Sequence, residues 1–275
     1  MLNTDKTQSL FRRATLALGM AAVLAPAAML SSPVVADPLL SGDTMKVGME
    51  ISYPPFESYE GDKVVGFDPE MSALLAAKLG AEASFVDTKF TSLILGLGAN
   101  KFDAVISGMY VTDERQKQAE AIPYARTGAY IMVNKGSAIQ PKTKEDLCGV
   151  EVGLQQGTAW VKQLTELSAS YCVPNGKDAI TIREFPSAPE VSQALLSRNV
   201  DAQLEIAGAA MMFAERTRGR IEISSPDLVY PQTLGIYVKK GNAELKQALQ
   251  TALAEITADG DYPELLKKYN LLAAE

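Results

Sequence analysis

The 275-residue chain contains no histidine, which removes the usual general base and the commonest metal ligand. Basic residues are also in the minority, 26 against 33 acidic ones, and the net charge is −7. Proteins that bind nucleic acids or anionic membranes are expected to be basic, so this balance argues against both. We therefore expect neither partner, and neither a metal nor a cofactor.

Long hydrophobic runs are missing apart from one near the N-terminus. Residues 1–36 have a basic start, an apolar run over about residues 14–30, and small residues before a cleavage point after Ala36. The run is shorter than the roughly 20 residues that a membrane span needs. We interpret it as a cleaved signal peptide, with a retained anchor as the alternative. Arg12-Arg13 leaves twin-arginine export open beside general secretion.

Cysteine is scarce too, since Cys148 and Cys172 are the only two. Two thiols alone make a poor metal site. In an exported chain a disulfide is the natural interpretation, and a pair of buried free thiols is the alternative.

Strand and helix patterns alternate after the leader. A strand pattern at residues 44–50 is followed by a helix pattern at 67–80, for which Asp68 is the expected N-cap and Gly80 the stop. The alternation continues to residue 107. This β-α-β-α-β order is typical of half of a doubly wound sheet with parallel strands.

The second half of the chain repeats this plan. Residues 191–202 lie 98 positions after residues 93–104 and share their helix pattern and their Asp-Ala strand entry. We therefore predict two similar α/β lobes rather than one long sheet. A C-terminal strand, a long helix and a short helix need a partner surface and are expected to pack on the first lobe. The predicted segments are a first lobe of residues 44–132 and 233–275 and a second lobe of residues 133–232.

This arrangement makes the backbone cross twice between the lobes, near residues 129–135 and 231–238. Two crossing segments make a hinge, and a cleft between lobes is a preferred ligand site.

Arg115 follows the end of a predicted strand at residues 102–107. Gly108 lets backbone N–H groups approach a ligand, and Thr112 is placed to cap a helix at residues 113–121. The guanidinium of Arg115 is a planar fork matched to a carboxylate. A solvated helix face, with Arg115 paired to a nearby acid, is the alternative that spacing leaves open.

The second lobe has a similar helix start. Gln155-Gln156-Gly157 leave a strand and Thr158 begins a helix, where free N–H groups and a hydroxyl make an anion site. An ordinary threonine cap is the alternative. Two such helix starts, one in each lobe, would hold one carboxylate from both sides.

Glu50, at the end of the first strand, is placed to take an ammonium or hydroxyl group of a ligand. Tyr53 and Phe56 follow in a proline-stiffened loop, with core packing as the alternative for both. Aromatic residues that are further candidates for the cleft are Phe90, Tyr110 and Trp160.

Five stretches resemble the extracytoplasmic solute-binding proteins of polar amino acid ABC transporters (family 3). They are YPPFE, GFDPEMSALLAAKLG, DAVISGMYVTDERQK, GLQQGT and ADGDYPELLKKYN, in order between about Met45 and Tyr269. The resemblance implies an α/β, two-lobe, type II periplasmic-binding-protein-like fold that closes on one small molecule. It also implies a periplasmic monomer that docks on a membrane permease. The segment from Cys148 to Cys172 resembles the subgroup with a disulfide in the second lobe.

The resemblance implies roles for individual residues. Arg115 matches the arginine that clamps the ligand's α-carboxylate, Thr158 the second-lobe carboxylate contact, and Tyr53 the aromatic that covers the ligand. Ser107 and Gly108 match loop positions whose hydroxyl and N–H groups help to hold the ligand.

The other end of the ligand is less well defined. Glu50 stands where many members have an aspartate, but Ile206 occupies the position of the aspartate that usually holds the α-ammonium. Glu205 precedes it and replaces it only if the strand bends or ends there, because neighbouring strand side chains face opposite ways. Tyr110 stands where a small serine is common. The ligand is expected to be an amino acid whose ammonium meets Glu50 or Glu205, or a carboxylate without that ammonium.

A binding protein of an ABC importer is the favoured function. An exported lyase of the cyclohexadienyl dehydratase type, with Glu50 or Glu205 as an acid of raised pKa, is one alternative. A sensory ligand-binding module is another.

Overall fold

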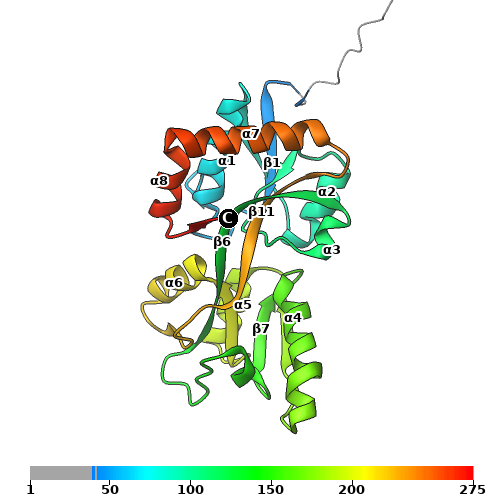
Figure 1. The fold of residues 1–275 in the computed structure, drawn as a ribbon. Helices are drawn as coiled ribbons and strands as arrows, with labels where there is room; N and C mark the ends of the chain where they lie inside the picture. Colours follow the sequence, from blue (N-terminus) through cyan, green and yellow to red (C-terminus); the bar gives the residue numbers. More distant parts are fainter. Residues whose placement is uncertain (1–38, 41, 275) are drawn as a thin grey trace, which may run out of the picture. The chain divides into compact units, whose positions relative to one another are not determined.

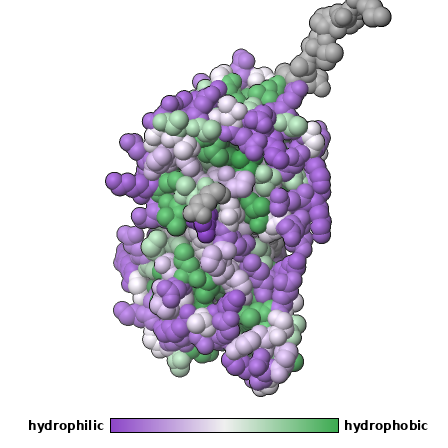
Figure 2. All heavy atoms as spheres, in the orientation of Figure 1, coloured by the Kyte–Doolittle hydropathy of each residue, from purple (hydrophilic) through white to green (hydrophobic). Residues whose placement is uncertain are grey.

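The computed structural model describes residues 39, 40 and 42–274. The predicted signal peptide, residues 1–36, lies outside them. Within the described part, every helix is too short or too polar to cross a membrane. The face shown in Figure 2 is mostly hydrophilic, with hydrophobic residues in scattered patches.

The first lobe contains three parallel strands with β1 in the middle. They match the predicted strands, although the third is shorter than expected. A small hairpin, β2 and β3, stands apart from this sheet. The elements are β1 (Thr44–Met49), β2 (Ser58–Glu60), β3 (Lys63–Val65), α1 (Phe67–Lys78), β4 (Glu82–Asp87), η1 (Phe90–Ser92), α2 (Leu93–Gly98) and β5 (Ala104–Val105).

The second lobe repeats this arrangement with β7 between β8 and β9, all parallel. Figure 1 shows α4, α5 and α6 around β7. The elements are η2 (Lys144–Leu147), β7 (Glu151–Gln155), α4 (Ala159–Leu167), the π-helical turn η3 (Ser168–Cys172), η4 (Val173–Asn175), β8 (Thr181–Phe185), α5 (Ala188–Leu196), β9 (Ala202–Ile206), α6 (Ala207–Arg216) and β10 (Ile221–Ile223).

The Asp-Ala repeat of the sequence is also a repeat of backbone contacts. Asp103 accepts a hydrogen bond from the Lys46 N–H at 2.8 Å and returns its own N–H to the Lys46 carbonyl at 2.9 Å. Asp201 makes the same pair with Glu151, at 3.4 Å and 2.8 Å. Each aspartate thus ties the entry of one strand to the neighbouring parallel strand.

Two long strands join the lobes, as predicted. β6 (Ala119–Asn134) and β11 (Val229–Lys239) pair antiparallel; β11 also pairs with β5, and β6 with β9. Figure 1 shows both strands running from one lobe to the other. The ladder is therefore continuous, in the order β4-β1-β5-β11-β6-β9-β7-β8. The two lobes share the crossing strands, so the predicted residues of the boundaries stay a prediction.

The prediction of a helix over residues 113–121 is wrong in length, because the observed helix is much shorter. α3 covers only Asp113–Gln116, with Thr112 as its cap, and the chain continues as β6 from Ala119. Ala119 to Thr127 pair with β11. This long-range ladder outweighs the local helix pattern.

The prediction that Asp68 is the N-cap of α1 is also wrong. Gly66 holds that position, and Asp68 is fully buried in the first turn. Its carboxylate instead accepts hydrogen bonds from the Gly108 N–H and the Tyr124 hydroxyl.

The C-terminal helices pack on the first lobe as predicted. α7 (Ala243–Asp259) and α8 (Asp261–Lys268) both contact α1, and Gly260 between them has a left-handed φ of 93°. Tyr262 and Leu265 are buried in this contact. Figure 1 shows both helices beside α1. The short β12 (Leu272–Ala273) then pairs with β6.

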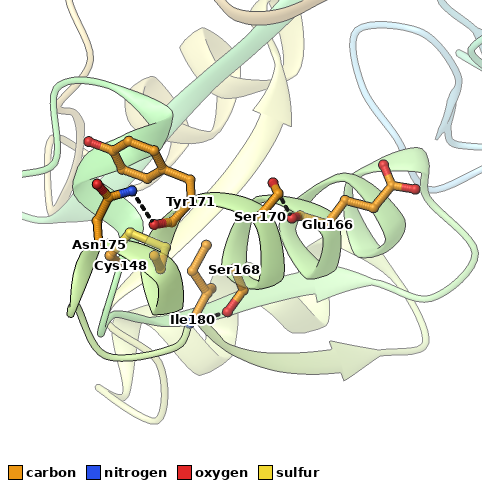
Figure 3. Close-up of a disulfide and its surroundings, with 8 residues drawn as sticks. Cys148, Glu166, Ser168, Ser170, Tyr171, Asn175 and Ile180 are labelled. Atoms are coloured by element: carbon orange, nitrogen blue, oxygen red, sulfur yellow. Dashed lines mark hydrogen bonds between the residues drawn. A yellow bond between two sulfur atoms is a disulfide. The ribbon is translucent and has the colours of Figure 1, made fainter.

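The predicted disulfide between Cys148 and Cys172 is confirmed, with Cα atoms 5.5 Å apart (Figure 3). It joins the end of η2 to the end of η3. Next to it, the Ile180 N–H donates to the Ser168 hydroxyl at 3.0 Å, which secures the return of the chain toward β8.

Candidate ligand site

A pocket lies at the carboxyl ends of the parallel strands of both lobes, where α/β proteins place their ligands. It has about 320 Å³ of space, counting the part open to solvent. Its lining residues are Tyr53, Phe90, Gly108, Tyr110 and Arg115 from the first lobe, and Gln155, Thr158, Ala159, Trp160, Glu205 and Ile206 from the second.

Arg115 carries the positive charge of this pocket. Its guanidinium donates to the Tyr110 carbonyl at 2.6 Å and to the Gly157 carbonyl at 2.9 Å, and its Cζ lies 5.4 Å from the Phe90 ring centre. Burial lowers the pKa of Arg115, since desolvation disfavours the charged form. Within residues 42–274 it makes no ion pair with an aspartate or glutamate.

The alternative in which Arg115 forms a surface ion pair with a neighbouring acid is not supported, because Glu114 and Glu120 have other partners. Glu114 pairs with Lys162 and Glu120 with Lys246, each at 2.7 Å. Arg115 therefore presents a partly desolvated cation to the pocket, held by two carbonyl oxygens with the Tyr237 side chain beside it.

The start of α4 faces the same pocket. The Thr158 hydroxyl donates to the Gln155 carbonyl at 2.8 Å and does not cap the helix with its side chain. The first N–H groups of a helix have no partners within it, and the helix dipole favours an anion there. Thr158 and Ala159 line the pocket, so these donors supplement Arg115.

Ser107 holds the pocket loop from behind. Its buried hydroxyl donates to Glu57 Oε1 at 2.7 Å and accepts the Glu50 N–H at 3.1 Å. It does not line the pocket, so its predicted ligand contact stays a prediction. Gly108 does line it, with a left-handed φ of 50° under the Tyr53 ring. Its N–H is taken by Asp68 at 2.6 Å.

Asp68 and Glu57 form a buried acid pair that the sequence did not reveal. Burial raises the pKa of Asp68 to about 6 and raises the pKa of Glu57 well above its ordinary value, each acid also influencing the other. Asp68 accepts from Gly108 and from the Tyr124 hydroxyl at 3.0 Å. The pair supports the ligand loop, and no local pattern brings its members together.

Glu50 lies behind the pocket rather than in its lining. Its carboxylate accepts a hydrogen bond from the Gln155 side chain, and burial raises its pKa against the lowering effect of that bond. Gln155 therefore occupies the pocket wall in front of Glu50, and no pattern in the sequence singles it out for this role.

Glu205 does face the pocket, and so does Ile206, because β9 ends at Ile206 and α6 begins directly after it. The Tyr53 hydroxyl donates to Glu205 Oε2 at 2.7 Å, and Gln203 donates to Oε1 at 2.9 Å. The Ile206 N–H donates to the same Tyr53 hydroxyl at 3.2 Å. Burial raises the pKa of Glu205 from 4.5 to about 7.

Glu205→Gln is expected to stabilise the ligand-free protein more at pH 8 than at pH 5. The folded protein keeps the Glu205 proton up to about pH 7, whereas the unfolded chain releases it near 4.5. Stability from this group is therefore lost as pH rises through that window, and the substitution removes the loss. The difference between the two pH values should be about 2 kcal/mol in the free energy of unfolding.

Denaturant unfolding at both pH values measures this effect. Glu184→Gln, on an exposed strand position, is the matched control and should show no such pH-dependent difference. An equal effect of Glu205→Gln at pH 5 and pH 8 would contradict the assignment.

Two α/β lobes joined by two strands, with a charged pocket at their strand ends, define a two-lobe binding protein with the type II periplasmic fold. The family described as "Bacterial extracellular solute-binding proteins, family 3" matches residues 45–271. The chain belongs to this family.

Curated relatives and solved structures agree with the fold and the family. "L-cystine-binding protein TcyJ" of Escherichia coli (strain K12) is 32% identical over 232 residues, which cover 82% of each chain. A structure described as "An ancestral arginine-binding protein bound to arginine" has a TM-score of 0.75 at 31% identity, covering 82% of this chain and 98% of that one. The ancestral amino acid-binding protein AncCDT-1, described as a precursor of cyclohexadienyl dehydratase, has a TM-score of 0.70 at 31% identity, with coverages of 82% and 95%.

Proposed function

We propose that this chain captures an amino acid or a related small carboxylate in the pocket between its lobes and delivers it to an ABC transporter permease. The observation that carries the proposal is the partly desolvated guanidinium of Arg115, which meets two carbonyl oxygens, the Phe90 ring and the Tyr237 side chain but pairs with no carboxylate of the described chain. A partly desolvated cation without a carboxylate partner is costly, and a ligand carboxylate would reduce that cost. The cystine- and arginine-binding relatives support an amino acid as the ligand class.

Glu205 would take the cationic group of the ligand. Apart from the tyrosines, Arg115 and Glu205 are the only lining residues of this pocket with ionisable side chains, so a zwitterion would complement both. A ligand cation would favour the ionised form of Glu205, whose pKa burial raises to about 7. Affinity for such a ligand should therefore fall as the pH drops from 8 to 6.

A thermal-shift screen of the mature protein tests the proposal. The panel should contain amino acids, opines, amines and organic acids, because a ligand that binds the folded state raises the melting temperature by mass action. We expect zwitterionic carboxylates to raise it and simple amines to leave it unchanged. Stabilisation by amines with no response to any carboxylate would overturn the proposal.

We also propose that the protein binds its ligand without converting it. The structural likeness to a precursor of cyclohexadienyl dehydratase and the raised pKa of Glu205 make a lyase the competing function. Against it, the hydrogen bonds that Glu205 accepts from Tyr53 and Gln203 favour its ionised form over the acid that a lyase needs. Incubation with prephenate or arogenate decides: release of an aromatic product would establish the lyase.

Export and assembly complete the proposal. Cleavage after Ala36 would leave a periplasmic monomer, which suits the extracellular family to which the chain belongs. Mass spectrometry of protein isolated from the periplasm should give an N-terminus at Asp37, and light scattering should give a single protomer. Uncleaved protein in the membrane fraction would point to the anchor instead.

A further inference from the structure

Tyr110 and Trp160 meet across the pocket from the two lobes. Tyr110 precedes α3, Trp160 lies in the first turn of α4, and their rings pack edge to face with centres 5.6 Å apart. Both line the pocket and are almost fully buried, at 4% and 3% exposure. Each contributes one polar atom to this otherwise aromatic contact.

Neither polar atom has a partner within the described chain. The Tyr110 hydroxyl and the Trp160 Nε1 are buried without a hydrogen bond. A buried donor left unsatisfied costs free energy, and unpaired groups of this kind are rare in folded proteins. Other hydroxyls of the pocket are engaged, since Tyr53 donates to Glu205 and Thr158 to a carbonyl. The two free groups therefore call for a partner from outside the chain.

Both groups are donors under all relevant conditions. An indole N–H can only donate. Burial and the nearby charge of Glu205 raise the pKa of the Tyr110 phenol far above neutrality, so its proton stays in place. The phenol could also accept, but the indole cannot, so a group that satisfies both must be a hydrogen-bond acceptor.

Tyr110 lies near both charged groups of the pocket. Its backbone carbonyl holds Arg115, whereas its ring lies near enough to Glu205 for that charge to act on the phenol. An acceptor on the ligand's side chain, distinct from the carboxylate that Arg115 would take, fits this position.

We propose that Tyr110 and Trp160 recognise a hydrogen-bond acceptor on the ligand's side chain and thereby select hydroxyl- or amide-bearing amino acids over hydrocarbon ones of the same shape. This inference rests on the proposed function and specifies its ligand class. Sites built to hydrogen-bond a ligand group reject analogues that lack it, because their own donors are then left unpaired.

Near-isosteric ligand pairs test the inference by titration calorimetry on the mature protein. The pairs are L-threonine with L-valine, and L-asparagine with L-leucine. The acceptor-bearing member should bind about tenfold more tightly in at least one pair, as expected for one buried hydrogen bond. The preference of the wild-type protein for the acceptor-bearing ligand tests the inference before any variant is made.

Variants locate the preference on the two donors. A Tyr110→Phe, Trp160→Phe double variant should bind both members of the pair with similar affinity. Tyr262→Phe is the matched control, because its hydroxyl is also buried and unpaired but lies in α8, outside the pocket lining. It should keep the full preference, and circular dichroism should show that all variants fold.

Four results would overturn the inference. One is equal wild-type affinity within both pairs, and another is tighter binding of the hydrocarbon members. The third is an equal loss for both members in the double variant, which would mean that the donors serve the common carboxylate. Binding of none of the four would also overturn it, but Arg115-dependent binding of any other carboxylate in the thermal-shift screen would leave the proposed function standing.

Discussion

Arg115→Ala should weaken binding of the best amino-acid ligand from the screen by about hundredfold or more. The guanidinium is partly desolvated and meets two carbonyl oxygens, the Phe90 face and the Tyr237 side chain. Its alanine variant would leave the ligand carboxylate buried without a counter-charge, which costs far more than the loss of an exposed pair. Titration calorimetry of wild type and variant measures the difference.

Two further variants make this result specific. Arg115→Lys keeps the charge but loses the planar fork, and is expected to bind with intermediate affinity. Arg183→Ala removes an exposed arginine that pairs with Glu151 at 2.8 Å on the second lobe, and should leave affinity unchanged. If Arg115→Ala binds as tightly as Arg183→Ala, the carboxylate does not lie on Arg115.

Removal of the Cys148–Cys172 disulfide should lower the free energy of unfolding by about 3 kcal/mol. The two cysteines are 24 positions apart, and the cross-link removes the corresponding loop-closure entropy from the unfolded chain. For a protein of this size the loss corresponds to a fall of about 6 to 12 °C in melting temperature. A Cys148→Ala, Cys172→Ala double variant avoids an unpaired thiol and is the best form of the experiment.

Ligand affinity is the internal control for the disulfide. Neither cysteine lines the pocket, so the folded double variant should bind with wild-type affinity. Reduction of the wild type with dithiothreitol should reproduce the fall in melting temperature once thiol titration shows complete reduction. An unchanged melting temperature under those conditions would refute the stabilising role.

The alternation of strands and helices was predictable because it depends on local periodicity. The parallel strands, the C-terminal helices and the Asp-Ala repeat appear where the patterns placed them. The early end of the helix expected at residues 113–121 could not be predicted, because pairing of β6 with β11 decides the conformation after Gln116. That pairing joins segments about 110 positions apart, beyond any window of local pattern.

Some residues of the candidate site could likewise be predicted from local sequence, and others could not. Arg115 and Thr158 follow strand ends and begin helices, which is a feature of local sequence, and the structure brings both to one pocket. Glu205 could not be placed from the sequence, because its direction depends on the residue at which β9 ends. Asp68 resembled a helix cap locally, whereas burial turns it toward Gly108.

The sequence by itself determined the two-lobe α/β plan, indicated the cysteine pair, and placed Arg115 after a strand end. Periodicity, turn residues and charge carry these features and need no knowledge of distant contacts. Only the tertiary structure decided which side chains meet in the pocket. In the structure, Ser107 and Glu50 lie behind the pocket lining, whereas Glu205 lies in it. The Tyr110 and Trp160 donors have no partners within the described chain. The physical reason is that burial and hydrogen bonding depend on the packing of two lobes against each other, which no single segment contains.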